Sequence, residues 1–97
     1  MMTAIRLLDE SRIAVSRDQV SCDLEGEVAI LNLKNSVYYG LDPVAASVWS
    51  LIQKPKTFAE IRDALLDMYE VESAQLESDL QVLLGQLSEQ GLIDIQP

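Results

Sequence analysis

Apolar and polar residues alternate in short runs through the first half of the chain, and this alternation predicts β-strands. The three clearest runs span residues 20–24, 28–33 and 36–41. Only Glu25-Gly26 and Lys34-Asn35 separate them, so we expect them to pair as an antiparallel meander with tight turns. The middle run carries apolar residues on both faces, which is typical of a central strand covered at least partly on each side.

The residues before this meander are patterned less regularly. We expect residues 1–11 to form a mobile or loosely docked arm, and the weak alternation of residues 12–16 favours an edge segment. The predicted organisation is therefore an N-terminal arm or edge segment at 1–19 and one domain at 20–97. A chain of 97 residues supports a single modest core.

The second half of the chain follows helical spacing. Asp42 is suited to cap a helix whose first turn holds Pro43, and this helix is predicted to end before Lys54-Pro55-Lys56. Thr57 and Glu60 form a capping-box pair at the start of a second helix. The spacing assigns to the core Val44, Val48, Leu51 and Ile52 in the first helix, with Trp49 beside them, and Phe58, Ile61, Leu65 and Met68 in the second.

A third helix is predicted from Ser73, its candidate cap, to about Gln90, with Gly91 at the left-handed position that ends it. Residues 92–95 then form a short extended tail. The apolar stripe of this helix consists of Leu76, Leu80, Leu83 and Leu87, with Leu84 at the edge of the stripe.

This order predicts an α+β fold in which a three-stranded antiparallel sheet is followed by three helices, an arrangement like a winged helix-turn-helix. Charge argues against DNA binding, because sixteen acidic and seven basic residues give a formal net charge of −9. Nucleic acids and anionic membranes select basic surfaces, so neither is expected as a partner. The third helix, which would have to enter the major groove, has no Lys or Arg.

The sequence holds no catalytic or metal-binding motif. It has no histidine and one cysteine, Cys22, which excludes Ser-His-Asp and Cys-His systems and disfavours a zinc site. Its four glycines are scattered, so no phosphate-binding loop is formed. We therefore predict a protein that is not an enzyme and has no metal or cofactor. Cys22 is interpreted as a buried thiol, and the lack of a signal peptide, spanning segment or cysteine pair favours the cytoplasm.

A surface is therefore the candidate for function. Tyr38 and Tyr39 are adjacent on the last strand, where Tyr39 is expected to point inward with Val37 and Leu41, and Tyr38 to the opposite face. If this strand is the edge of its sheet, its free N–H and C=O groups can pair with an extended peptide.

One face of the third helix offers a possible second wall for such a site. Val82 lies away from the leucine stripe, near Gln75, Asp79 and Gln86. An isolated valine on a polar helix face is common and needs no function. The alternative is that these four residues line a groove opposite the tyrosine strand.

Four segments of the chain, LNLKNSVYYGL, DPVAASVW, TFAEIRDALLDMYEV and LLGQLSEQGLI, together resemble the PqqD family. The resemblance runs from about residue 20 to residue 95 and rests on the order and spacing of small apolar and aromatic positions. This family is the stand-alone form of the precursor-peptide recognition element of ribosomal peptide biosynthesis. The YYGL-then-helix form is most similar to the leader-binding proteins of lasso-peptide gene clusters.

The resemblance implies that the leader of a precursor peptide adds as a further strand beside residues 36–41, against the helix at 73–90. It implies an adaptor without chemistry of its own, which presents the leader to a leader peptidase or another modification enzyme. An exposed edge strand also permits a weak homodimer as well as a monomer. The candidate leader-binding residues are Ser36, Val37, Tyr38, Tyr39, Gly40, Gln75, Leu76, Asp79, Leu80, Val82, Leu83 and Gln86.

Two other functions stay open on the sequence alone. In pyrroloquinoline quinone pathways, and in other modified-peptide pathways, the partner of such a protein is a radical-SAM enzyme. The chain can also be a structural subunit of an enzyme, without binding a peptide. A winged-helix DNA-binding protein fits the predicted order of elements but is disfavoured by the charge of the third helix.

Overall fold

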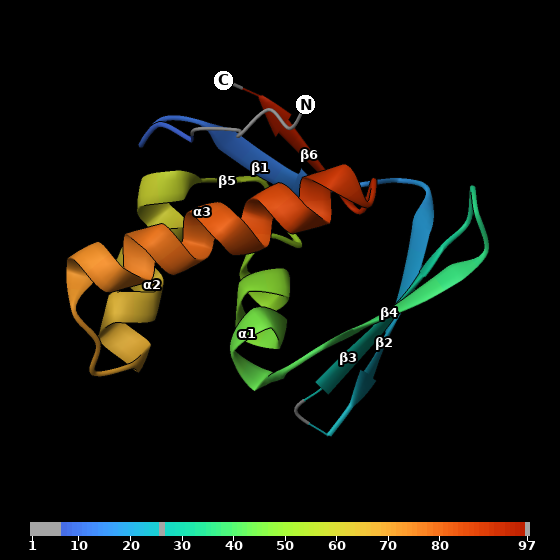
Figure 1. Ribbon diagram of the computed structural model, residues 1–97, viewed down its shortest axis with the longest axis horizontal. Helices are drawn as coiled ribbons and strands as arrows, with labels where there is room; N and C mark the ends of the chain where they lie inside the picture. Colours follow the sequence, from blue (N-terminus) through green and yellow to red (C-terminus); the bar gives the residue numbers. More distant parts are fainter. Residues whose placement is uncertain (1–6, 26, 97) are drawn as a thin grey trace.

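The computed structural model describes residues 7–25 and 27–96, and within them the chain forms six strands and three helices (Figure 1). The expected α+β class, with a three-stranded antiparallel sheet and three helices, is confirmed. In chain order the elements are β1 (Arg12–Val15), β2 (Gln19–Leu24), β3 (Glu27–Asn32), β4 (Val37–Leu41), α1 (Pro43–Leu51), β5 (Lys56–Thr57), α2 (Phe58–Met68), α3 (Ser73–Glu89) and β6 (Ile93–Gln96).

The predicted meander is present as the antiparallel sheet β2-β3-β4, with β3 in the middle. Ile30 of β3 lies opposite Ser21 of β2 and Tyr39 of β4, and its side chain is fully buried under α1. The other face of the sheet carries exposed apolar side chains, so the core lies on one side of this sheet. β3 is the central strand as predicted, but its two faces are covered unequally: Val28 and Ile30 are buried, whereas Ala29 and Leu31 on the outer face are only half-buried.

The turn between β3 and β4 is longer than predicted. Residues 33–36 form it, because the side-chain Oδ1 of Asn32 accepts the Lys34 N–H at 2.8 Å and folds the chain back early. Ser36 has a positive φ of 60° and is exposed in this turn. The two-residue turn and the placement of Ser36 on the strand were therefore wrong.

A second sheet, β5-β1-β6, was not predicted. β1 is its middle strand, with Ile13 paired to Lys56 on one side and Ile95 on the other, so the interpretation of residues 12–16 as an edge segment was wrong. Ile13 is fully buried. The extended tail expected at 92–95 is confirmed as β6.

The part of the predicted arm that the structure describes is docked rather than loose. Leu7 is buried, and its N–H and C=O both bond to the side-chain amide of Gln81 at 2.9 Å. Asp9 forms an ion pair with Arg62 of α2 at 3.0 Å. Residues 1–6 of the predicted arm lie outside the described residues.

Helix ends follow the predicted capping chemistry with one exception. Asp42 Oδ1 accepts the Ala45 N–H at 2.8 Å, and both bonds of the Thr57–Glu60 capping box are made. Gly91 has a φ of 73°, as expected for the residue that ends α3. The exception is Ser73, which starts α3 as its first helical residue, while Glu72 occupies the cap position without a side-chain bond.

The core differs from the periodicity in a few positions. Leu84 is fully buried at the centre of the α3 stripe while Leu83 is half-buried at its edge, the reverse of the expected arrangement. Met68 and Val44 are about half exposed, and Cys22 is exposed rather than buried. The core is formed by Leu7, Ile13, Val28, Ile30, Leu41, Ala45, Val48, Trp49, Ile52, Phe58, Ile61, Leu65, Leu76, Leu80, Leu84, Leu87, Leu92 and Ile93.

Candidate functional site

β4 presents a free edge. Among the described residues it has a hydrogen-bonded neighbour on one side only, β3. The Leu33 N–H donates to the Asp18 carbonyl at 2.9 Å, so the odd-numbered residues of β3 bond to β2 and its even-numbered residues bond to β4. The partners of those even-numbered residues are the odd-numbered residues of β4. The backbone N–H and C=O groups of Tyr38 and Gly40 therefore point to the open edge.

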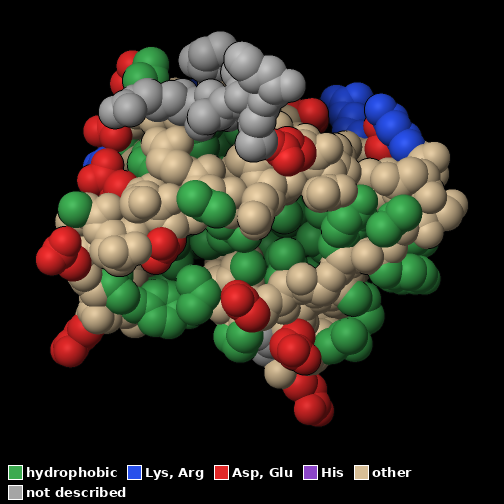
Figure 2. Space-filling view, in the orientation of Figure 1, with side chains coloured by type: hydrophobic (Ala, Val, Ile, Leu, Met, Phe, Trp, Pro, Cys, Tyr) green, Lys and Arg blue, Asp and Glu red, His purple; other side chains and the backbone are tan. Residues whose placement is uncertain are grey.

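α3 lies across from this edge, and two pockets follow one another along it. The first has a volume of about 510 Å³ and the second about 210 Å³. Leu83 lines both pockets and so stands between them. In the space-filling view, hydrophobic side chains gather in a hollow between α3 and the part of the molecule that holds α1 and β4 (Figure 2). We call these two pockets together the β4–α3 cleft.

The pocket nearer the C-terminal end of α3 is bounded on one side by β4 and the start of α1. Its lining residues are Tyr39, Gly40, Leu41, Asp42, Ala45, Leu83, Gln86, Leu87, Glu89, Gln90 and Leu92. The pocket nearer the N-terminal end is almost wholly apolar. Its lining residues are Val44, Leu65, Tyr69, Val71, Gln75, Leu76, Asp79, Leu80 and Leu83.

Gln90, just after α3, is hydrogen-bonded to both β3 and β4. Its carbonyl accepts a bond from Asn32 Nδ2 at 2.8 Å, and its side-chain Oε1 accepts one from the Tyr39 hydroxyl at 2.7 Å. Asn32 is buried, whereas Tyr39 is half-buried. The distance between the two walls of the cleft is therefore fixed at this end by the fold itself.

The charge around the cleft is negative. Three carboxylates, Asp42, Asp79 and Glu89, line the two pockets, and none of the Lys or Arg residues that the structure describes does. Asp79 is exposed at the rim of the apolar pocket, where its Oδ1 accepts a bond from Gln75 Nε2 at 2.9 Å. A ligand with an apolar side chain for the pocket and a cationic group near the rim fits this arrangement.

The structure brings most of the predicted site residues together. Tyr39, Gly40, Gln75, Leu76, Asp79, Leu80, Leu83 and Gln86 all line the cleft. Ser36, Val37, Tyr38 and Val82 line neither pocket: Val82 is 59% exposed, and Tyr38 is 72% exposed on the outer face of the sheet. The contribution of these four side chains to binding stays a prediction.

Several cleft residues were not predicted from the sequence. Val44 and Tyr69 line the apolar pocket, and Gln90 joins the walls. Val44 was assigned to the core by its spacing, but it is 48% exposed and lines this pocket. Tyr69 and Val71, two apolar residues in the segment that follows α2, are the signal that could have pointed to a lining role.

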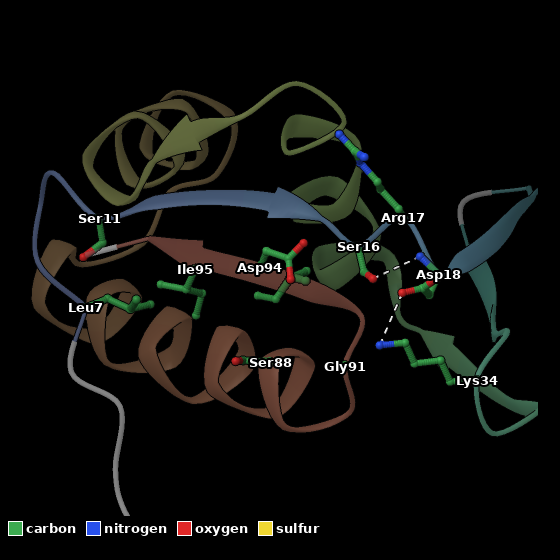
Figure 3. A pocket seen from close by; sticks show the side chains of 11 residues that line it. Leu7, Ser11, Ser16, Arg17, Asp18, Lys34, Ser88, Gly91, Asp94 and Ile95 are labelled. Carbon is green, nitrogen blue, oxygen red and sulfur yellow. Dashed lines mark hydrogen bonds and ion pairs between the residues drawn. The ribbon is translucent and has the colours of Figure 1, made fainter.

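A third cavity, of about 610 Å³, lies between β6, α3 and the loop after β1 (Figure 3). Two of its four charged side chains form an ion pair, since Lys34 Nζ lies 3.3 Å from Asp18 Oδ2; the other two are Arg17 and Asp94. Figure 3 shows Ser16, Asp18 and Lys34 together at one end, with Leu7 and Ser11 at the other. We find no feature in it that selects a ligand.

Within the part of the chain that the structure describes, no group of three or more His, Cys, Asp or Glu residues is placed to hold a metal ion. In the same residues, none of the helices has the length and apolar character needed to cross a membrane.

Comparisons with known proteins agree with this arrangement. Among solved structures, TbiB1 in complex with the TbiA(β) leader peptide is 34% identical, with 84% of this chain and 94% of that chain covered and a TM-score of 0.80. A lasso peptide synthetase B1 complexed with its leader peptide has the same fold, at 21% identity, 88% and 98% coverage and a TM-score of 0.74. No curated protein matches the sequence.

The sequence pattern of one family matches the chain over residues 27–93, and this family is PqqD, described as coenzyme PQQ synthesis protein D. The matched residues include β3, β4, all three helices and the first residue of β6. They make up more than half of the chain and contain both walls of the cleft. The protein described here is therefore a member of the PqqD family.

Proposed function

We propose that this protein is a non-catalytic adaptor, which binds the leader region of a ribosomally made precursor peptide in the β4–α3 cleft and presents it to a maturation enzyme. The observation that carries the proposal is a free strand edge that faces a helix across two pockets. The likeness to TbiB1, whose structure holds a leader peptide, supports the nature of the ligand.

The leader binds by adding a strand to β4. The N–H groups of Tyr38 and Gly40 donate to peptide carbonyls, and their carbonyls accept from peptide N–H groups. Alternate peptide side chains then point to the cleft side of the sheet, where the two pockets receive them. The backbone bonds hold any extended peptide, and the pockets select among sequences.

Apolar side chains supply most of the binding free energy. Ordering about ten peptide residues costs roughly 1–2 kcal/mol each in backbone entropy, which the hydrogen bonds alone do not offset. One or two leader side chains are therefore expected to dominate, packed against Tyr39 and Leu83. Val37, which is 43% exposed at the start of β4, extends this surface.

The maturation enzyme is a leader peptidase acting with a cyclase in lasso-peptide biosynthesis, as the resemblance of the sequence to the leader-binding proteins of lasso-peptide gene clusters favours. A second candidate is a radical-SAM enzyme of a pyrroloquinoline quinone pathway or another modified-peptide pathway, which the match to coenzyme PQQ synthesis protein D favours.

The test is calorimetric titration of the full chain with the leader of a short open reading frame encoded beside its gene. Proline is placed at each leader position in turn. Because only alternate peptide N–H groups face β4, binding is expected to be lost at every second position across the bound segment and kept at the positions between.

Each outcome decides the mode of binding. An alternating pattern supports strand addition. Uniform tolerance of proline contradicts it, even where the peptide binds, because no backbone bond is then required. If no neighbouring leader binds, the adaptor function is contradicted and a structural subunit is favoured. Binding of the chain to a maturation enzyme in the absence of peptide would then support the structural role.

A further inference from the structure

Among residues 7–25 and 27–96, the sheet β2-β3-β4 has a second edge without a strand neighbour, β2, which the leader-binding proposal does not use. Five of its six residues are exposed. Val20 and Leu24 are 55% and 53% exposed on the outer face, while Ser21 and Asp23 lie on the inner face. An exposed edge strand that carries apolar side chains is a template for pairing with another chain.

The backbone groups available at this edge follow from the β2–β3 register. The bond from the Leu33 N–H to the Asp18 carbonyl makes the even-numbered residues of β2 the ones that bond to β3. The N–H and C=O groups of Gln19, Ser21 and Asp23 therefore point outward. This leaves three donors and three acceptors in a row.

The sequence of β2 is complementary to itself when two copies run antiparallel with Cys22 opposite the second copy's Cys22. In this register Val20 lies opposite the second copy's Leu24, and both side chains are apolar and exposed. Ser21 lies opposite the second copy's Asp23, so a hydroxyl donor meets a carboxylate. The outward-pointing backbone groups of Ser21 and Asp23 find partners, because odd-numbered residues meet odd-numbered residues, whereas Gln19 lies opposite the second copy's Glu25, a turn residue beyond the end of β2.

The neighbouring symmetric registers are worse. Centring the pair on Asp23 places two carboxylates directly opposite each other, which is destabilising. Centring it on Ser21 removes the contact between Val20 and Leu24 and places Asp18 opposite the second copy's Leu24. One register is therefore favoured by both charge and apolar contact.

The space beside β2 also suits a second strand. A pocket of about 450 Å³ lies between the inner face of β2 and α1, and its lining is mixed: Ser21, Asp23, Ser50 and Gln53 are polar, whereas Val28, Ala46 and Trp49 are apolar. The side chains that a second copy would place on this face are its own serine, aspartate and glutamine. The polar lining residues Ser50 and Gln53 are available to pair with such side chains, and the apolar pair stays on the outer face.

We infer that two copies of this chain pair through β2 about a two-fold axis at Cys22, which joins their sheets into one of six strands. The two β4 edges then lie at the far ends of this sheet and stay free. The inference does not depend on leader binding, and dimer formation leaves both clefts open.

Net charge makes the dimer weak at low salt. Each copy carries a formal charge of −9, and the repulsion between copies is screened as ionic strength rises. Dimerisation is therefore expected to strengthen with added sodium chloride.

Cys22 provides the test, because it is the one cysteine in the chain. In an antiparallel pair, residues of a non-hydrogen-bonded pair have Cα atoms about 4.5 Å apart, which is within the range of about 4.4–6.8 Å that a disulfide spans. Diamide, which takes up the two thiol hydrogens, is expected to cross-link the full chain into a dimer on a non-reducing gel. Moving the thiol by one residue, in the double variant Cys22→Ser with Ser21→Cys, is expected to abolish most cross-linking.

Sedimentation velocity measures the same dimer without oxidant. Leu24→Lys is expected to shift the chain to monomer at concentrations where the wild type is dimeric. Leu33→Lys is the control, because Leu33 is 52% exposed in the turn after β3 and does not lie on the open edge of β2, and this variant is expected to keep the dimer. Circular dichroism checks that both variants are folded.

Three results would overturn the inference. The first is a wild-type chain that stays monomeric into the hundreds of micromolar at both low and high salt. The second is equally fast cross-linking of the cysteine at positions 21 and 22. The third is a dimer that Leu24→Lys leaves intact and Tyr38→Lys disrupts, which would place the contact at β4.

Discussion

Leu83 is the residue that both pockets of the β4–α3 cleft share. It is half-buried, so it contacts the core on one side and faces the cleft on the other. Its neighbour Leu84 is fully buried and faces the core alone. The two leucines therefore separate binding from stability at adjacent positions of α3.

Leu83→Ala is expected to weaken leader binding about tenfold, roughly 1.4 kcal/mol, because both pockets lose a lining side chain. Titration calorimetry measures this loss. Ser78→Ala is the control on the same helix, and it is expected to leave affinity unchanged because Ser78 is exposed and lines neither pocket.

Thermal unfolding of Leu83→Ala and Leu84→Ala distinguishes the role in leader binding from the role in stability. Leu84→Ala is expected to cost about 2–5 kcal/mol of stability, as for a fully buried leucine, and Leu83→Ala clearly less. Equal binding by Leu83→Ala and wild type would contradict the place of this residue in the cleft.

Single residues show where sequence patterns stop being informative. Asp42, Thr57, Glu60 and Gly91 were assigned correctly because caps depend on bonds within one turn of the chain. The roles of Leu83 and Leu84 were interchanged, because successive positions differ by about 100° and the centre of an apolar stripe is set by what packs against it.

At the scale of elements, α2 depends on its capping box. The Thr57 N–H donates to the Glu60 carboxylate at 2.8 Å. This bond is the main reason why the pKa of Glu60 lies below its ordinary value of 4.5. A carboxylate with a lowered pKa stabilises the folded state above the unfolded pKa, and this contribution is lost as the pH falls through the folded pKa.

Glu60→Gln is therefore expected to lower the melting temperature at neutral pH, with a difference from wild type that shrinks as the pH falls below about 4. Thermal melts across this range measure it. Glu70→Gln, in the turn after α2, is the control and is expected to have little effect. A difference that is the same at all pH values would mean that the charge of Glu60 is not involved.

The elements that escaped prediction are those paired over long distances in the sequence. β2, β3 and β4 are consecutive, so local alternation and turns identified them. β1 pairs with β6 across nearly the whole chain, and each has four residues, too few for a periodicity to stand out. Two walls of the cleft, the tyrosine strand and α3, were predicted from the sequence. The contribution of α1 and α2 to its lining was not, because it depends on how these helices pack in three dimensions.

On the scale of the whole molecule, the acidic surface affects which peptides bind. Asp79 stands at the rim of the apolar pocket, where we propose that it attracts a basic residue of the leader. Asp79→Lys is expected to weaken binding more at low salt than at high salt, because screening reduces a charge effect at an exposed site. Titration at two salt concentrations measures this.

The control for Asp79→Lys is Asp67→Lys, which makes the same change in net charge on an exposed position of α2 outside both pockets. It is expected to have the smaller effect at low salt. Equal weakening by Asp79→Lys at both salt concentrations would exclude an electrostatic role for this carboxylate.

The two hydrogen bonds to Gln90 bear on the kinetics of leader binding. Because Asn32 and Tyr39 already hold β3 and β4 at a set distance from α3, the cleft is preformed at that end before a peptide arrives. No wall has to be displaced to admit the incoming strand there. We therefore expect diffusional encounter, rather than a prior opening of the protein, to determine how fast a leader is captured.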